Sequence, residues 1–428
     1  MTLGPGADID LVVEKPAAGG RMIARHEGQV VLVSGAIPEE RVRARVERIG
    51  KGVVYAATRE VLRAAPDRRQ APPDWACGGN VYAHIAYARQ LTLKGEILTD
   101  ALARIGRIPL DAPPAVAPSI ERGYRMRARF HVAGGRIGFF REGTHELCDP
   151  AATGQLLDET AALVGRLSEM LVTERIEGVT GLEVAENRPA SERVFHFEVD
   201  DRCAVDRLTS VSRLGGVTGI TCARAGTRAL LHGSPYVTDS LEVAATSSRA
   251  GEPVRLRRHV LAFFQGNRYL LPDLVAHVVS RAGDGPIIDL YAGVGLFAVA
   301  VAAAGKRPVT AVEGDRTSAA DLQANALAAG DAVRPVYMPV EDFLRDRPPA
   351  PGTTLIVDPP RTGMSKQAMA GIVAQAADRI VYVSCDVATL ARDLRKLLDA
   401  GSRLDEVRGF DLFPNTAHVE AVAVLTRA

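Results

Sequence analysis

The sequence is poor in cysteine, in net charge and in long apolar runs. Its 428 residues include only five cysteines, too few and too irregularly spaced for a disulfide framework. The longest apolar run, LFAVAVAAAG, falls well short of the ~18 residues that a membrane span needs. The N-terminal MTLGPGADID has neither a basic start nor an apolar core, so we expect no signal peptide. These absences predict a soluble, cytoplasmic protein with no membrane contact.

The formal net charge is +1, so no global field indicates a partner, and any nucleic-acid surface must be local. A hydrophobic content of 47% is ample for cores, and the length allows two or three domains.

The chain divides into three unlike regions. Residues 1–64 carry short β-branched runs between Gly, Pro and charged turns, which predicts a small antiparallel barrel. After a Pro- and charge-rich joint, AAPDRRQAPPD, a mixed α+β region extends over 65–255. From 256 to 428, strands and helices alternate, which is typical of an α/β, Rossmann-like, doubly wound sheet.

The segment PIIDLYAGVGLFAVAVAAAG predicts a strand, a glycine turn and a helix. Gly293 and Gly295 allow a tight turn and close approach to a ligand, and Glu313 ends the next strand, where it can bind a ribose. The turn predicts a nucleoside cofactor. With Ala298, the glycines also satisfy the fingerprint of nicotinamide enzymes, and a plain structural turn is a third interpretation.

Two further signals lie where strands of the last region should end. TLIVDPPRTG places Asp358 at a strand end and stiffens the next residues, which can present Asp358 and Arg361 to a bound ring. VYVSCDVATLARDL places Cys385 between a strand and a helix that Asp386 caps, where the helix dipole favours thiolate. The alternatives are an ordinary proline-stiffened loop and a small buried thiol.

Five motifs in series make the pattern specific: FFQGN, DLYAGVG, IVDPPRTG, VYVSCDVATLARDL and FPNTAHVEAV. Together they resemble the RNA 5-methyluridine methyltransferases that use S-adenosylmethionine. The stretch VEKPAAGGRMIARHEGQVVLVSGAIPEERVRARV resembles the TRAM domain that many members carry. The resemblance is close over about the first 60 residues and over 255–428, and looser between them.

The resemblance implies roles for particular residues. Cys385 matches the nucleophile that adds to carbon 6 of uracil, and Glu420 matches the base that removes the carbon 5 proton, a task that suits a raised pKa. His418 is expected to be structural, and Leu296 departs from a position that is often polar in the family. The implied cofactor contacts are Gln265, Tyr291, Gly293, Gly295, Glu313, Asp342 and Asp358.

RNA binding is predicted from two alternating runs of arginine, which a strand would place on one face to contact phosphates. Residues 41–70 hold nine Arg or Lys against three Asp or Glu. The expected partner is tRNA or rRNA, with no obligate protein partner. A solvated strand face is the other interpretation of each run. The runs are Arg41, Arg43 and Arg45, and Arg125, Arg127 and Arg129.

Some family members hold an iron–sulfur cluster on four cysteines. Here only Cys77 and Cys148 match the ligand positions, while Ala71 and Asn80 stand where two others are expected. Two thiolates cannot supply four ligands, so we predict no cluster and no metal, with both residues as remnants or packed thiols. The other cysteines, at 203 and 222, are expected to be structural.

Other functional classes stay open at this point. A nicotinamide-dependent oxidoreductase accounts for the glycine turn but leaves Cys385 and DPPR unexplained. An RNA-binding protein with an inert catalytic fold is also compatible with the pattern. Among methyltransferases, an RNA cytosine-5 enzyme is the nearest rival, although such enzymes commonly pair two cysteines, one of them after a proline, where DPPR has Arg361.

Overall fold

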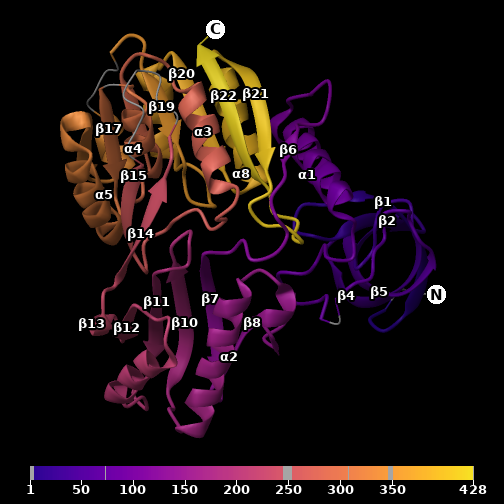
Figure 1. Cartoon of the computed structure of the whole chain (residues 1–428). Helices are drawn as coiled ribbons and strands as arrows, with labels where there is room; N and C mark the ends of the chain where they lie inside the picture. Colours follow the sequence, from indigo (N-terminus) through magenta and orange to yellow (C-terminus); the bar gives the residue numbers. More distant parts are fainter. Residues whose placement is uncertain (1–3, 73, 244–252, 307, 346–349, 428) are drawn as a thin grey trace.

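The computed structural model describes residues 4–72, 74–243, 253–306, 308–345 and 350–427. The N-terminal part is a closed barrel in the strand order β1-β2-β3-β5-β4, seen at the right of Figure 1. Alternate residues of β1, such as Ile9, Leu11 and Val13, point into its core. The predicted barrel is confirmed, but it is not wholly antiparallel, because the third and fifth strands of the chain pair in parallel. Its strands are β1 (Asp8–Pro16), β2 (Met22–His26), β3 (Gln29–Ser34), β4 (Arg41–Gly50) and β5 (Val53–Arg63).

The middle of the chain forms a second sheet in the order β13-β12-β11-β10-β7-β8-β9. Helix α2 (Asp158–Thr173) packs on it through buried residues such as Leu163 and Leu167. The short helices η2 (Ala151–Thr153) and η3 (Val205–Leu214) lie beside it. The strands are β7 (Arg127–Ala133), β8 (Arg136–Phe140), β9 (Leu147–Cys148), β10 (Val179–Glu186), β11 (Arg193–Val199), β12 (Gly219–Arg224) and β13 (Thr227–Gly233).

A two-stranded ladder connects this sheet to the last part of the chain. It consists of β14 (Tyr236–Leu241) and β15 (Val254–His259), so the boundary predicted at 255/256 falls inside β15.

The C-terminal part is a sheet in the order β18-β17-β16-β19-β20-β22-β21-β6, parallel from β18 to β20. Its two faces are covered by separate hydrophobic cores, one with α3, α4 and α5 and the other with α6, α7 and α8. The predicted α/β, doubly wound sheet is confirmed. The strands are β6 (Val116–Ala117), β16 (Ile287–Leu290), β17 (Val309–Glu313), β18 (Val333–Tyr337), β19 (Thr354–Val357), β20 (Arg379–Ser384), β21 (Ser402–Phe410) and β22 (Glu420–Arg427).

The helices of this part are α3 (Leu271–Arg281), α4 (Leu296–Ala303), α5 (Arg316–Ala328), η4 (Gly330–Ala332), α6 (Val340–Arg345), α7 (Lys366–Gln375) and α8 (Val387–Asp399). Among the residues that the structure describes, no helix combines the length and apolarity needed to cross a bilayer.

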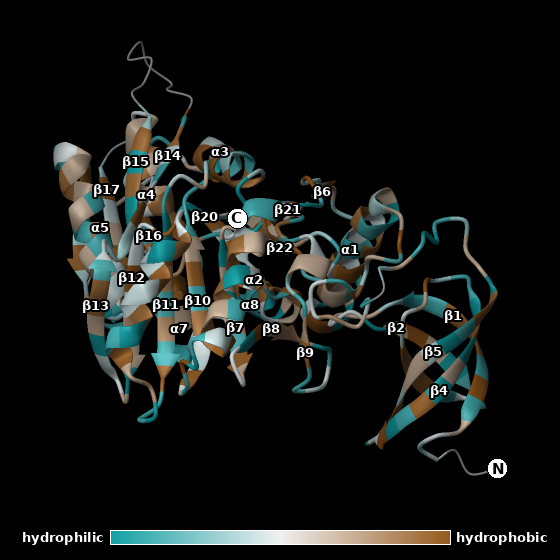
Figure 2. Cartoon of the chain, turned by 60° about the horizontal axis from the view of Figure 1, so that its bottom comes forward, coloured by the Kyte–Doolittle hydropathy of each residue, from teal (hydrophilic) through white to brown (hydrophobic). Residues whose placement is uncertain are grey.

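A segment from the middle region completes this C-terminal sheet. Helix α1 (Tyr87–Ala101) and the π-helical turn η1 (Leu102–Gly106) pack against α8, and β6 pairs with β21. In Figure 1, α1 lies between the barrel and β21. Leu93 of α1 belongs to the barrel core, whereas Leu98 packs in the core of the C-terminal sheet. The helix therefore joins two cores, and Figure 2 shows brown apolar segments along it.

Two cysteines are placed differently from the prediction. Cys77 and Cys148 are joined by a disulfide, so the expectation of packed thiols is wrong. The loop after the barrel pairs with the end of β8 at Arg141, and β9 pairs with β8 beside it. These pairings bring the two Cα atoms to 5.9 Å, within reach of a disulfide. Cys203 and Cys222 are free and buried.

Candidate active site

The candidate site lies where β16, β19 and β20 end. These strands run parallel in the sheet, so the residues that follow them meet at one edge. The glycine turn follows β16, Asp358 follows β19 and Cys385 follows β20. The edge therefore gathers the motifs that the sequence singled out.

The glycine turn requires left-handed backbone at three positions, with φ of 60° at Tyr291, 57° at Gly293 and 94° at Gly295. A Cβ atom on Gly295 would come within 2.8 Å of Leu322, whereas one on Gly293 would meet nothing within 4 Å. Position 295 therefore requires glycine, because the neighbouring side chain leaves no room for a Cβ atom there. Gly293 instead borders open space that a ligand can enter. The Glu313 carboxylate accepts a hydrogen bond of 2.8 Å from the Gly293 N–H. This bond links the end of β17 to the glycine turn.

The buried polar groups around this turn fit a nucleoside-type cofactor. Asp289 is fully buried; its Oδ2 accepts from the Ala298 N–H at 2.9 Å, while its Oδ1 has no hydrogen-bond partner within the described part of the chain. Burial raises the pKa of Asp289 and of Glu313 above their usual values. Half-buried Tyr291 lies in the same turn. An unpartnered acceptor, an open glycine and a second carboxylate suit a ligand that carries hydroxyl and amine donors.

Two other predicted cofactor residues are linked to each other, and a third stands apart. The buried Gln265 amide donates to Asp358 Oδ2 at 3.2 Å, and burial raises the pKa of Asp358 to about 7. Asp342 is exposed on α6 and pairs with Arg345 at 2.6 Å.

Cys385 lies between β20 and α8, as predicted, and the Asp386 carboxylate caps the helix by accepting from the Thr389 N–H at 2.8 Å. Its thiol is half-buried, and this burial, followed by the charge of Glu420, raises its pKa to about 11. Arg361 lies close enough to lower the pKa but does not outweigh them. The helix dipole was expected to favour thiolate, but burial and the nearby carboxylates act in the opposite direction and raise the pKa.

Glu420 opens β22, which lies between β20 and β21 rather than at an edge. Ser384 pairs with Ala421, so Cys385 and Glu420 are neighbours at the ends of antiparallel strands. Glu420 is only 2% exposed, and burial, reinforced by the charge of Asp358, raises its pKa well above the usual value. The direction of this pKa shift suits a residue that removes a proton, and its main cause is burial.

The first arginine run lies on an exposed face of β4. Its charges are partly balanced, because Arg43 binds Asp10 at 3.0 Å and Arg45 binds Asp8 at 2.9 Å, while Arg41 lies 3.5 Å from Asp10.

The second run is not the uniform open row that the alternation predicted. Arg129 is exposed, but Arg127 is half-buried and pairs with Glu183 at 2.8 Å. Arg125 precedes β7, its backbone pairs with Asn267 instead of a sheet strand, and its guanidinium donates to Gln155 at 2.6 Å. Burial, and to a smaller extent the nearby charge of Arg361, lowers the pKa of Arg125.

Sequence reasoning gave no role to two other features near the site. Phe263 lies two residues before Gln265, and its side chain is 57% exposed. The motif FFQGN could have indicated a binding role for it, because it places an aromatic residue beside polar residues. The other feature is a network of polar contacts between α1 and the loop before Glu420. No local sequence pattern predicts it, because its partners are far apart in the chain.

Known proteins resemble this chain in sequence. Residues 351–428, which contain Asp358, Cys385 and Glu420, match the tRNA (Uracil-5-)-methyltransferase family, and residues 5–57 match the TRAM domain. An uncharacterized RNA methyltransferase of Streptomyces avermitilis is 34% identical, with 99% of each chain covered. One from Streptomyces coelicolor is 33% identical over 99% of this chain and 93% of its own.

The fold also matches a crystal structure. The Pyrococcus abyssi tRNA (uracil-54, C5)-methyltransferase in complex with S-adenosyl-L-homocysteine superposes with a TM-score of 0.78 at 23% identity, over 97% of this chain and 99% of that one. The chain therefore belongs to the RNA (uracil-5-)-methyltransferase family with an N-terminal TRAM domain.

Proposed function

We propose that the protein methylates carbon 5 of a uridine in tRNA or rRNA, with Cys385 as nucleophile and Glu420 as base. The observation that carries the proposal is the pairing of Ser384 with Ala421, which makes Cys385 and Glu420 neighbours at the edge that holds the glycine turn. A thiol that can reach carbon 6 and a carboxylate that can reach the proton on carbon 5 of the same pyrimidine ring are what this chemistry requires.

S-adenosylmethionine supplies an electrophilic methyl group when it is bound. The open side of Gly293 and the carboxylate of Glu313 support a place for its nucleoside, and buried Asp289 offers an unpartnered acceptor. The residues that would hold it are Gln265, Tyr291, Gly293, Gly295, Glu313 and Asp358, with Asp342 as the proposed adenine contact.

The protein's own groups account for the steps on the base. The Cys385 thiolate adds to carbon 6, which makes carbon 5 nucleophilic enough to accept the methyl group. Glu420 then removes the carbon 5 proton, and the thiolate leaves as the double bond forms again. Burial favours this role for Glu420, because a carboxylate with a raised pKa is a stronger base. The guanidinium of Arg361 opposes the rise in the Cys385 pKa and so favours attack.

RNA binding rests on charge and on one aromatic ring. The exposed arginines Arg41, Arg43, Arg45 and Arg129 can contact phosphates, while Arg125 and Arg127 lie deeper. A pocket of about 340 Å³ is lined by Arg127, Arg129 and Arg228 together with glutamates. The target base must leave its stack at a cost of a few kcal/mol, and exposed Phe263 offers a ring against which it can stack.

A mechanism-based trap tests the proposal. We expect the protein with S-adenosylmethionine to form a covalent adduct with 5-fluorouridine RNA but not with 5-fluorocytidine RNA, because fluorine at carbon 5 blocks proton removal. Cys385→Ala should abolish the adduct and keep RNA affinity, and Cys203→Ala, at a buried thiol outside the site, should keep both.

Each alternative class has its own outcome. Adducts with 5-fluorocytidine alone would indicate a cytosine enzyme, and binding of nicotinamide dinucleotides without S-adenosylmethionine would indicate an oxidoreductase. RNA binding without methyl transfer by the wild type would indicate an inert fold. Mapping 5-methyluridine in cellular RNA with and without the protein would identify the position modified.

A further inference from the structure

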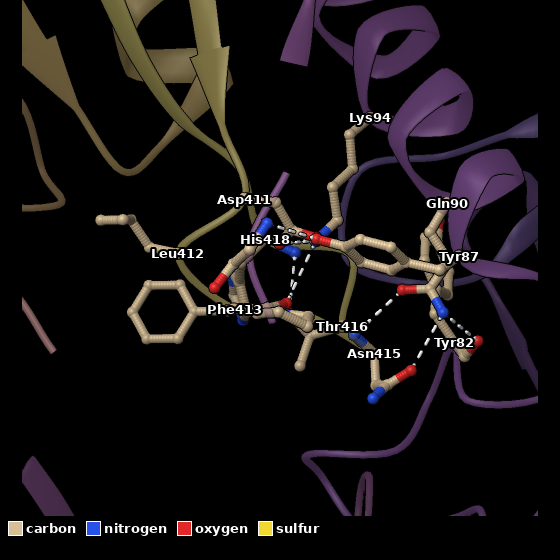
Figure 3. A network of polar contacts seen from close by, with 12 residues as sticks. Tyr82, Tyr87, Gln90, Lys94, Asp411, Leu412, Phe413, Asn415, Thr416 and His418 are labelled. Atoms are coloured by element: carbon tan, nitrogen blue, oxygen red, sulfur yellow. Dashed lines mark hydrogen bonds and ion pairs between the residues drawn. The ribbon is translucent and has the colours of Figure 1, made fainter. Parts of the chain in front are cut away.

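The loop between β21 and Glu420, residues 411–419, is held by α1 from the other end of the chain. Figure 3 shows α1 residues reaching this loop. Two contacts, one neutral and one charged, come from successive turns of the helix, since Gln90 and Lys94 are four residues apart on one face. Both side chains are fully buried.

The neutral contact is a reciprocal pair between Gln90 and Asn415. The Asn415 N–H donates to Gln90 Oε1 at 2.9 Å, and Gln90 Nε2 donates to Asn415 Oδ1 at 3.0 Å. Asn415 has a left-handed backbone with φ of 63°, and its carbonyl accepts from the Tyr82 N–H at 2.8 Å. The left-handed position of the loop is therefore fixed by residues of the segment that precedes and begins α1.

The charged contact is an ion pair between Lys94 and Asp411, in which both side chains have 0% exposure. Lys94 Nζ also donates to the Phe413 carbonyl at 3.1 Å, and the hydroxyl of Tyr87 lies against the Asp411 carboxylate. The same loop is also anchored by Asn267, whose amide donates to the Leu412 carbonyl at 3.0 Å. The first half of the loop, from Asp411 to Asn415, thus has directional partners.

Holding a loop in place does not by itself require charge, because an apolar pair of similar size is often as stable as a buried ion pair. A pair of charges with fixed hydrogen-bond directions does restrict where the backbone can go. From Asn415 the chain reaches Glu420 within five residues, so a shift of the loop moves the carboxylate. Misplacement by about 1 Å is enough to slow a proton transfer about 100-fold.

We propose that Gln90 and Lys94 are positioning residues that set the Glu420 carboxylate for removal of the carbon 5 proton. This inference rests on the proposed function. In the step concerned, Glu420 takes the proton, the electron pair of the C5–H bond forms the C5–C6 double bond, and the C6–S bond breaks to release Cys385 as thiolate. Cys385 itself follows β20, and the side-chain contacts of Gln90 and Lys94 reach the loop before Glu420 instead, so addition of the thiolate to carbon 6 should be less affected.

The test is a double variant, Lys94→Met with Asp411→Leu, which removes the pair without leaving a buried unpaired charge. In single-turnover reactions with uridine RNA and S-adenosylmethionine, the covalent adduct is quantified on denaturing gels alongside released 5-methyluridine RNA. We expect adduct formation within about 3-fold of wild type but release slowed at least 10-fold, so that adduct accumulates. Asp100→Asn, which removes an exposed ion pair of α1, should behave as wild type.

A second variant keeps the test valid if the first does not fold. Asn415→Gly preserves the left-handed backbone and removes the side-chain contact to Gln90, so it should also accumulate adduct. Unchanged release in a folded variant, or equal losses of formation and release, would overturn the positioning role. A wild-type protein that forms neither adduct nor 5-methyluridine would instead overturn the proposed function itself.

Discussion

The thiol of Cys385 should react slowly at neutral pH in the RNA-free protein. Burial and the charge of Glu420 raise its pKa from 9.0 to about 11. At pH 7 the thiolate fraction is then on the order of 10⁻⁴, about 100-fold below that of an unperturbed thiol of this kind. Because thiolate is the reactive form, alkylation by iodoacetamide should rise about tenfold per pH unit between pH 7 and pH 10.

The assay is a time course of alkylation, followed by mass spectrometry of the peptide that contains Cys385, with Cys385→Ser to assign the signal. Glu420→Gln should speed the reaction, since it removes a charge that raises the pKa, whereas Arg361→Met should slow it. A rate that levels off below pH 9 would show that the thiol ionises much earlier. The argument from burial and carboxylate charge would then be refuted.

Three further outcomes are expected. Glu186→Gln should destabilise the fold by about 3–5 kcal/mol in urea unfolding, because Glu186 is the shared partner of buried Arg193 and Arg268. Burial lowers the pKa of His84 to about 4, so the neutral ring contributes fully to stability above about pH 6.5, and this contribution is lost as the pH falls toward 4. Between pH 7.5 and pH 5, the free energy of unfolding of wild type should therefore fall by about 2 kcal/mol relative to that of His84→Gln, as measured by urea unfolding. Gly295→Ala should weaken S-adenosylmethionine binding at least 10-fold by calorimetry, because its φ of 94° and the 2.8 Å approach to a neighbouring side chain force the turn to move.

Local patterns predicted the elements that carry the site. The leucine period after Cys385 and the capping Asp386 predicted α8, whose Leu390 and Leu394 are fully buried. The barrel followed from β-branched alternation, although β2 (Met22–His26) lay outside the predicted runs because it has few β-branched residues.

Properties that depend on distant neighbours could not be predicted in the same way. The pKa of the Cys385 thiol is set first by burial and then by the charges of Glu420 and Arg361, none of which a rule about helix ends includes. Likewise, Lys94 and Asp411 are 317 residues apart, so nothing near either one indicates that they meet. The domain boundaries and the roles of the individual site residues stay predictions.

The position of Leu93 in the barrel core, one residue before Lys94, has a consequence for the evolution and dissection of the enzyme. Trimming away the barrel would expose Leu93 and loosen the helix that, in our proposal, positions Glu420, so a truncated protein should lose turnover as well as affinity for RNA. An exchange of barrels between relatives would have to carry the helix and its loop contacts with it. On this proposal, RNA binding by the barrel and proton removal at the site would be inherited together.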